Sequence, residues 1–257
     1  MSLYYIRFGF DGTAFHGYQT QDNELNLRTA QQELEEKLSI LFREKIVITG
    51  ASRTDTGVHI VESFAHFKTE QPLPEHAVRR INFMLPSDIG VSRLGLAPEG
   101  FHSRFDAIQR HYIYHIHYDK DPFLHNRSLH FPYRHLDLDK MNEAAAYLKE
   151  QTDFATFCKR NSDNKTTRCR IDYIHWSQPT TNRIQFEVHA DRFLRGMIRG
   201  LVGTMIKVGN GKTSFAQFKE IVASHDNKNA DFSVPGCGLY LTRVIYPEAL
   251  EKALLAE

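Results

Sequence analysis

The sequence predicts an α+β fold made of two ferredoxin-like (split β-α-β) halves, with antiparallel sheets and a central cleft between them. The first observation is that hydrophobic periodicity gives the order strand, helix, strand, strand, helix, strand over residues 1–105. The second is that a similar order follows over residues 106–257. With 257 residues, 41% hydrophobic and 25% charged, the composition is that of an ordinary globular protein of one large or two average domains. The duplication rests on element order, since the residues themselves show no clear repeat.

Six elements are expected in the first half, where apolar residues alternate or recur at helical spacing. In chain order they are a strand over 3–10, a helix over 29–43, a strand ending near 50, a strand over 60–68, a helix over 75–84 and a strand over 89–96. Asp11-Gly12-Thr13 is a turn signal after the first strand, and Pro72 and Pro74 precede the second helix.

The second half repeats this order with one additional helix. Its elements are a strand over 107–118, a helix over 138–149, strands over 170–176 and 184–190, helices over 194–208 and 215–223, and a last strand over 239–246. In the helix over 194–208, Gly196, Gly200 and Gly203 are spaced by four and three residues. This spacing predicts a face of small residues that another element can approach closely.

Charge and cysteine content argue against a strongly basic nucleic-acid-binding protein and against a disulfide-rich protein. The formal net charge of +1 gives no global electrostatic argument for nucleic-acid binding, although five basic and no acidic residues lie between Arg192 and Lys212. Such a run is either a phosphate-binding face or an ordinary solvated surface. The three scattered cysteines suggest neither a disulfide framework nor a metal-binding pair, and neither a signal peptide nor a membrane span is visible. A cytoplasmic protein is expected.

A short polar loop between two strand-like runs holds Arg53 and Asp55, two residues apart, with Gly50 and Gly57 on either side. A loop held at both ends by strands commonly presents a reactive side chain, and Asp55 is the candidate. From these residues alone, Asp55 is equally consistent with a turn residue that pairs with Arg53 at the surface.

The expected strand over 107–118 alternates two chemistries. Tyrosines 112, 114 and 118 share one face, and histidines 111, 115 and 117 share the other. Tyrosines on an open sheet face stack on nucleobases in RNA-binding sheets, whereas on a covered face they line a core. His115 and His117 are also a candidate metal pair, although no cysteine or carboxylate at matched spacing completes it.

Arg199 lies near the start of the expected glycine-bearing helix, where the helix dipole disfavours a cation. An anionic partner, either Asp55 or an RNA phosphate, would stabilise it there. The alternative is an arginine that faces solvent.

Several motifs, in the same order, resemble the TruA family of tRNA pseudouridine synthases nearly from end to end. Ser52–His59 resembles the family's G-R-T-D-A-G-V-H loop, with Ser52 in place of Gly and Thr56 in place of Ala. The further matches are Asp11-Gly12-Thr13 with Phe15, Gly17 and Gln19 (D-G-T-x-F-x-G-x-Q), Phe101–Phe105 (F-H-A-R-F), Arg110–Tyr114 (R-x-Y-x-Y), and Phe193-Leu194 with Met197-Ile198-Arg199.

The resemblance implies isomerisation of uridine to pseudouridine at positions 38, 39 and 40 of the tRNA anticodon stem-loop. It further implies base flipping, no cofactor, no required metal and a homodimer. The competing interpretation is a noncatalytic RNA-binding protein with duplicated ferredoxin-like halves, which would give Asp55 no task.

The resemblance also implies residue roles. Asp55 would be the nucleophile, Arg199 its basic partner, and Tyr112 the residue that stacks on the flipped base and is a candidate acceptor of the C5 proton. Arg53 would occupy the space of the displaced nucleotide, and Leu239 would form an apolar wall near the base. Two basic runs, over residues 160–170 and 192–199, add Arg168, Arg170 and Arg195 as hypothetical phosphate contacts.

Overall fold

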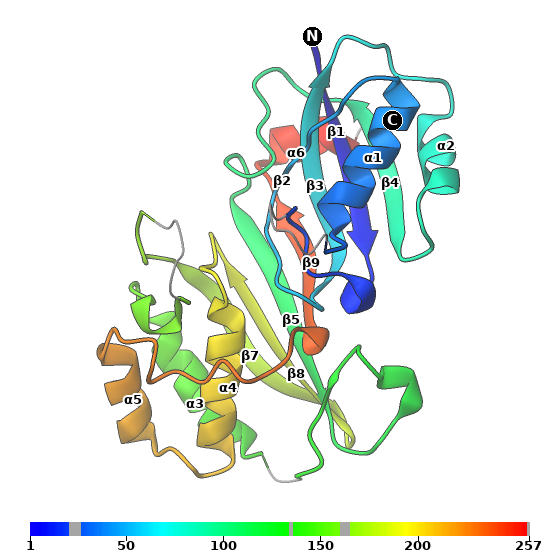
Figure 1. Ribbon diagram of the computed structural model, residues 1–257. Coiled ribbons are helices and arrows are strands. Elements are labelled where there is room, and N and C mark those ends of the chain that lie inside the picture. Colours follow the sequence, from blue (N-terminus) through cyan, green and yellow to red (C-terminus); the bar gives the residue numbers. More distant parts are fainter. Residues whose placement is uncertain (21–26, 134–135, 160–164, 256–257) are drawn as a thin grey trace. The chain divides into compact units, whose positions relative to one another are not determined.

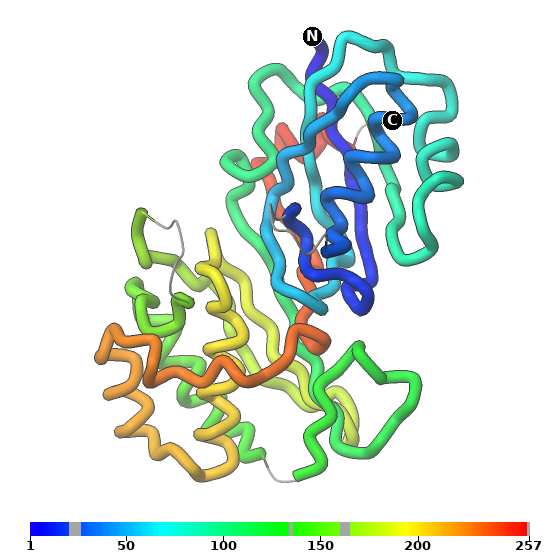
Figure 2. The backbone as a smooth tube through the Cα atoms, in the orientation of Figure 1, coloured from blue at the N-terminus to red at the C-terminus, as the bar shows by residue number. Residues whose placement is uncertain are grey.

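The computed structural model describes residues 1–20, 27–133, 136–159 and 165–255 (Figure 1). The chain forms two compact units. The first contains Met1–Arg110 and the C-terminal stretch from Tyr240, and the second contains His111–Leu239. In Figure 2 the red C-terminal backbone accordingly runs back among the blue and cyan segments of the first unit. The domain boundary between residues 105 and 106 stays a prediction.

The sheet of the first unit has the strand order of a split β-α-β arrangement. Its strands are β1 (Ser2–Phe10), β2 (Thr49–Gly50), β3 (His59–Thr69), β4 (Ile89–Leu96) and β9 (Leu239–Ile245). The order is β4-β1-β3-β9, and β2 pairs with β3. β1 runs antiparallel to both neighbours, whereas β9 runs parallel to β3 at Ile60 and Leu241. The predicted ferredoxin-like order of the first half is therefore confirmed.

Three helices of the described chain belong to this unit, and the first has a capping residue at its start and a left-handed residue at its end. They are α1 (Ala30–Phe42), α2 (Ala77–Met84) and α6 (Glu248–Leu255). The Thr29 hydroxyl accepts a hydrogen bond from the Gln32 amide, and Arg43 ends α1 in the left-handed region at φ 57°. Leu34 and Leu38, four residues apart, are fully buried. Figure 1 shows α1 crossing in front of the sheet. The sequence reading had not predicted α6.

The second unit repeats the succession of strand, helix, hairpin and helix. Its elements are β5 (Gln109–His117), β6 (Leu129–His130), α3 (Leu138–Lys149), β7 (Ile171–Thr180), β8 (Arg183–Ala190), α4 (Met197–Gly209) and α5 (Phe215–Ala223). The strand order is β5-β8-β7, and β7 and β8 are antiparallel. Trp176 and Phe186 are buried and contact each other, with ring centroids 4.9 Å apart. Trp176 N donates to Asn142 Oδ1 of α3 at 2.8 Å, and its Nε1 donates to Met205 Sδ of α4 at 3.4 Å.

The predicted start of α4 was wrong by three residues. The helix begins at Met197 because Gly196, just before it, has a φ of 74°. Gly196 is thus outside the small-residue face, which retains Gly200 and Gly203. A Cβ at Gly203 would lie 2.3 Å from the Asp231 carbonyl oxygen, and one at Gly200 would lie 2.8 Å from the Phe232 ring. The predicted close approach is confirmed for these two glycines.

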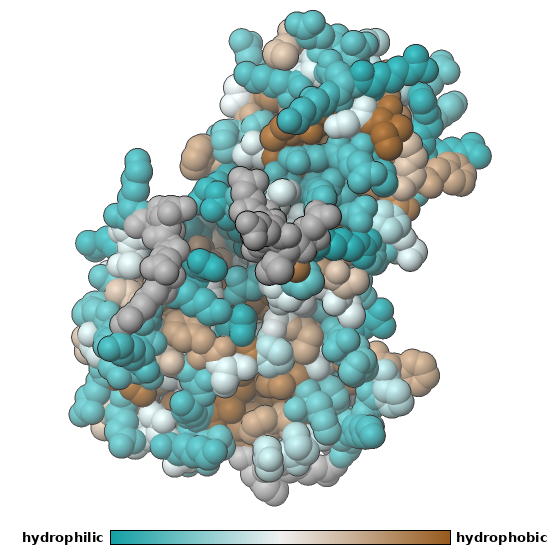
Figure 3. Space-filling view, in the orientation of Figure 1, coloured by the Kyte–Doolittle hydropathy of each residue, from teal (hydrophilic) through white to brown (hydrophobic). Residues whose placement is uncertain are grey.

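The surface of the first unit is mainly hydrophilic on the visible face, with hydrophobic residues showing between α1 and α2 (Figure 3). Within the described part of the chain, no helix has the length and apolar character needed to cross a membrane.

Candidate functional site

The loop that carries Asp55 spans residues 51–58, between β2 and β3. Three backbone hydrogen bonds define its path. Tyr18 N donates to Thr54 O (3.3 Å), Gly57 N donates to Phe15 O (3.2 Å), and Val58 N donates to Asp55 O (3.2 Å). The segment after β1, residues 12–18, therefore holds the Asp55 loop and is called the clamp below. This contact gives a physical reason for the Asp11-Gly12-Thr13 motif and the Ser52–His59 motif to occur in one sequence.

Two glycines allow the clamp to approach the loop closely. A Cβ on Gly12 would lie 2.1 Å from the Val58 carbonyl oxygen, and a Cβ on Gly17 would lie 2.4 Å from the Thr54 carbonyl oxygen. Gly17 also has a φ of 97°, in the left-handed region that favours glycine. A side chain at either glycine would therefore push the two backbone segments apart.

Gly12→Ala is expected to lower the isomerisation rate by about 100-fold, because its Cβ displaces the end of the Asp55 loop and a shift of about 1 Å can cost that much. The measurement is pseudouridine formation from saturating tRNA under single-turnover conditions. Gly90→Ala is the matched control, because nothing lies within 4 Å of a Cβ at that glycine. Equal rates for the two variants would show that the clamp does not position the loop.

His59 joins the loop, the clamp and β9, and the sequence reading had not singled it out. Its side chain is buried, and its Nδ1 accepts a hydrogen bond from Gly12 N at 3.0 Å. The imidazole stacks on Tyr240 with ring centroids 4.4 Å apart and an interplanar angle of 14°. The signal in the sequence was the histidine that ends the Ser52–His59 motif.

Asp55 and Arg53 differ in exposure. Asp55 is half-buried, whereas Arg53 in the same loop is exposed to solvent. A carboxylate that is partly covered yet reachable is suited to contact a substrate, and an exposed arginine beside it can contact phosphate or occupy space next to a base.

Tyr112 lies in the second unit, on the covered face of its sheet. Tyr112 is 6% exposed and Tyr114 is fully buried. The Tyr112 ring meets Phe193 edge-on, with centroids 5.1 Å apart, and the Tyr114 hydroxyl donates to Pro235 O at 2.8 Å. Burial raises the pKa of Tyr114 above its ordinary range, so its hydroxyl stays protonated. The core interpretation is therefore correct for Tyr114, and Tyr112 is also largely covered.

His117, one of the two histidines of the candidate metal pair, packs against another imidazole. His117 is buried and stacks on His130 with centroids 5.1 Å apart, and burial lowers the pKa of His117. Over the residues that the structure describes, no group of three or more His, Cys, Asp and Glu side chains is arranged to hold a metal ion. The described residues thus give the metal pair of His115 and His117 no third ligand.

Arg199 is the third residue of α4, where the helix dipole is unfavourable to a cation. Its Nε donates to Val234 O at 2.7 Å, and its Nη2 donates to Phe232 O at 3.2 Å. These carbonyls belong to the segment against which Gly200 and Gly203 pack. The two hydrogen bonds fix the direction of the guanidinium and show that Arg199 is not a freely solvated arginine.

The other predicted substrate contacts also lie in the second unit. Leu239 is buried at the start of β9, just after the short helix Gly236–Gly238. Arg168, Arg170 and Arg195 are exposed, and Arg170 Nε lies 2.9 Å from Asp172 Oδ1. The part of the basic run at residues 160–164 lies outside the described residues. Exposed guanidinium groups are compatible with phosphate contact.

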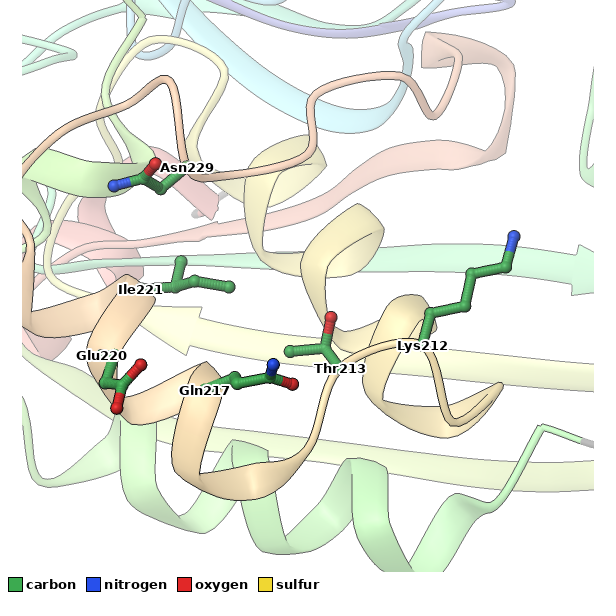
Figure 4. A pocket seen from close by; sticks show the side chains of 6 residues that line it. All are labelled: Lys212, Thr213, Gln217, Glu220, Ile221 and Asn229. Carbon is green, nitrogen blue, oxygen red and sulfur yellow. The ribbon is translucent and has the colours of Figure 1, made fainter.

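A separate pocket in the second unit lies beside α5 (Figure 4). Its walls are Lys212, Thr213, Gln217, Glu220, Ile221 and Asn229. None of the predicted catalytic or substrate-binding residues lines this pocket, and we assign it no role in the chemistry.

Comparison with known proteins identifies the family. The family described as tRNA pseudouridine synthase matches residues 144–247. A protein from Porphyromonas gingivalis named tRNA pseudouridine synthase A is 41% identical over 254 residues, which cover 97% of this chain and 99% of that protein. Proteins of the same name from Parabacteroides distasonis and Bacillus subtilis are 41% and 35% identical and cover 97% and 92% of this chain, and 98% and 96% of their own lengths. This chain therefore belongs to the tRNA pseudouridine synthase A family.

Proposed function

We propose that this chain isomerises uridine to pseudouridine at positions 38, 39 and 40 of the tRNA anticodon stem-loop. The observation that carries the proposal is the Asp55 loop, clamped by the segment after β1, in a chain 41% identical to a tRNA pseudouridine synthase A over nearly its whole length. A noncatalytic RNA-binding protein would have no use for a carboxylate held in this way.

The reaction rearranges bonds within one nucleotide and therefore balances without a cofactor. The bond between N1 of uracil and C1′ of ribose breaks, the ring rotates, and a new bond joins C5 to C1′. The C5 proton leaves and N1 gains a proton. In our proposal the Asp55 carboxylate either adds to C1′ or assists departure of the base as a glycal forms, and both routes require the carboxylate beside the ribose.

Four further residues act around Asp55 in this proposal. Arg199 pairs with the Asp55 carboxylate and orients it, which requires the two side chains to meet although they belong to different units. Tyr112 stacks on the flipped base and is a candidate acceptor of the C5 proton. Arg53 fills the space that the flipped nucleotide leaves, and Leu239 contacts the base through its apolar side chain. Extrusion of the base costs a few kcal/mol, which such contacts offset.

The remaining parts of the proposal concern the partners of the enzyme. The exposed side chains of Arg168, Arg170 and Arg195 contact tRNA phosphates, which supports recognition of tRNA shape over base-by-base reading. The enzyme acts as a homodimer in the cytoplasm and requires no cofactor or metal.

The test is release of tritium from tRNA labelled at C5 of its uridines, since formation of the new bond to C5 expels that hydrogen. We expect the purified protein to release tritium from this tRNA. A tRNA with cytidine at positions 38, 39 and 40 should still bind but release none. Binding without release from the unmodified tRNA would instead support the noncatalytic alternative.

A further inference from the structure

A buried arginine in the first unit connects the start of the Asp55 loop to the strand that carries Tyr112. Arg110, the second residue of β5, is 8% exposed. Its Nη1 donates to Ala107 O at 2.8 Å, and its Nη2 donates to Arg104 O at 2.6 Å and to Ala51 O at 3.4 Å. A planar guanidinium reaches carbonyls of several segments at once, whereas the donors of a lysine are gathered at one point.

The three carbonyls lie outside the strands, so the hydrogen bonds between strands do not include them. Ala51 is the first residue of the Asp55 loop and precedes Asp55 by four positions. Its amide donates to Phe64 O of β3 at 2.8 Å, while its carbonyl accepts from Arg110. Both polar backbone groups of Ala51 are thereby held, one by the sheet and one by Arg110.

The connection between β4 and β5, to which Arg104 and Ala107 belong, is itself fixed near the same loop. Ser103 is fully buried, its hydroxyl donates to Thr49 O at 2.6 Å, and its carbonyl accepts from the Tyr246 hydroxyl at 2.6 Å. The Ser103 amide donates to His66 Nδ1 at 3.1 Å, and burial lowers the pKa of His66 to about 4, so the imidazole stays neutral. Arg110 thus donates hydrogen bonds both to the fixed β4–β5 connection and to Ala51 at the start of the Asp55 loop.

We propose that Arg110 is a positioning residue for the isomerisation. Strand alternation places Arg110 and Tyr112 on the same face of β5, two residues apart. The guanidinium sets the start of the Asp55 loop relative to the point where the strand carrying Tyr112 leaves the first unit. Arg110 contacts neither reacting atoms nor substrate in this role. The inference rests on the proposed roles of Asp55 and Tyr112.

The test compares Arg110→Lys, which keeps the charge but loses the planar fork, with Tyr246→Phe as a matched control. Tyr246 is also buried, and its hydroxyl donates to the Ser103 carbonyl of the same connection. The readouts are the single-turnover rate at saturating tRNA, the tRNA dissociation constant and the thermal unfolding midpoint. We expect Arg110→Lys to lower the rate about 30- to 100-fold with the dissociation constant changed less than threefold. Tyr246→Phe should stay within threefold in both.

A merely structural arginine would give a different pattern. Equal rates in the two variants at similar unfolding midpoints, or a loss in Arg110→Lys that follows the dissociation constant, would overturn the proposal. Arg110→Gln repeats the test if the lysine variant does not fold, and failure of both to fold would assign Arg110 to stability alone. Asp55→Asn is measured in parallel. Full activity in that variant would refute the role of Asp55, whereas the comparison of Arg110 with Tyr246 would still report on the loop start.

Discussion

Asp55→Asn is expected to abolish pseudouridine formation, with a rate at least about 10⁴-fold below that of the wild type, because removal of a nucleophile eliminates the step that breaks the glycosidic bond. Asparagine is isosteric with aspartate, and the backbone bonds that define the loop use main-chain atoms of Phe15, Tyr18 and Val58. The variant should therefore fold and bind tRNA with an affinity within a few fold of the wild type. Tritium release and filter binding measure the two quantities.

The matched control for Asp55 is Asp226→Asn, because Asp226 is an exposed turn aspartate that accepts a hydrogen bond from Lys228 N. This variant should keep the wild-type rate. A rate in Asp55→Asn within tenfold of the wild type would remove Asp55 from the chemistry and return it to the role of a turn residue.

Tyr112→Phe is expected to lower the single-turnover rate by about 10²- to 10³-fold if the Tyr112 hydroxyl accepts the C5 proton, since loss of a general base has effects of this size. The aromatic ring remains, so base stacking and tRNA affinity should change little. The measurement is tritium release under saturating tRNA, together with the dissociation constant.

Tyr114→Phe separates chemistry from packing on the same strand. Removal of the Tyr114 hydroxyl loses its hydrogen bond to the carbonyl of the exposed Pro235, which should cost about 0.5–1.5 kcal/mol of unfolding free energy with a rate close to wild type. If Tyr112→Phe behaves in the same way, Tyr112 acts through its ring alone, and the proton acceptor is another group.

Local patterns in the sequence were sufficient for most of the fold. The helices α3 and α5 have the predicted bounds, because each shows helical spacing of apolar residues and a capping residue, Asp137 or Ser214, just before it. The start of α4 was predicted too early because Leu194 fits the hydrophobic period, whereas the left-handed backbone of Gly196 begins the helix later. A single glycine in an apolar run does not show which conformation it takes.

The candidate site was predictable only where motif residues themselves carry the chemistry. Asp55, Arg53 and Tyr112 could be predicted because they lie in motifs that resemble those of the family, in the same order along the chain. The residues that hold them act through backbone groups, as when Arg110 donates to three carbonyls and Gly12 approaches the Val58 carbonyl. Every residue has a backbone carbonyl, so the residue type does not show which carbonyl accepts such a hydrogen bond. These contacts can therefore be identified only from the structure.

The return of Tyr240 and the residues after it to the first unit has a consequence for synthesis. The second unit, His111–Leu239, lies within the sequence of the first as an insertion of about 130 residues. On the ribosome, β9 and α6 emerge after the second unit, and at roughly 5–20 residues per second the first unit waits between about 6 and 26 s for β9. During that interval β3 lacks its parallel partner at His59 and Ile60, and Ile108 N lacks its acceptor, the Ile245 carbonyl. The stretch that follows the Asp55 loop is thus completed only after the whole second unit has been synthesised.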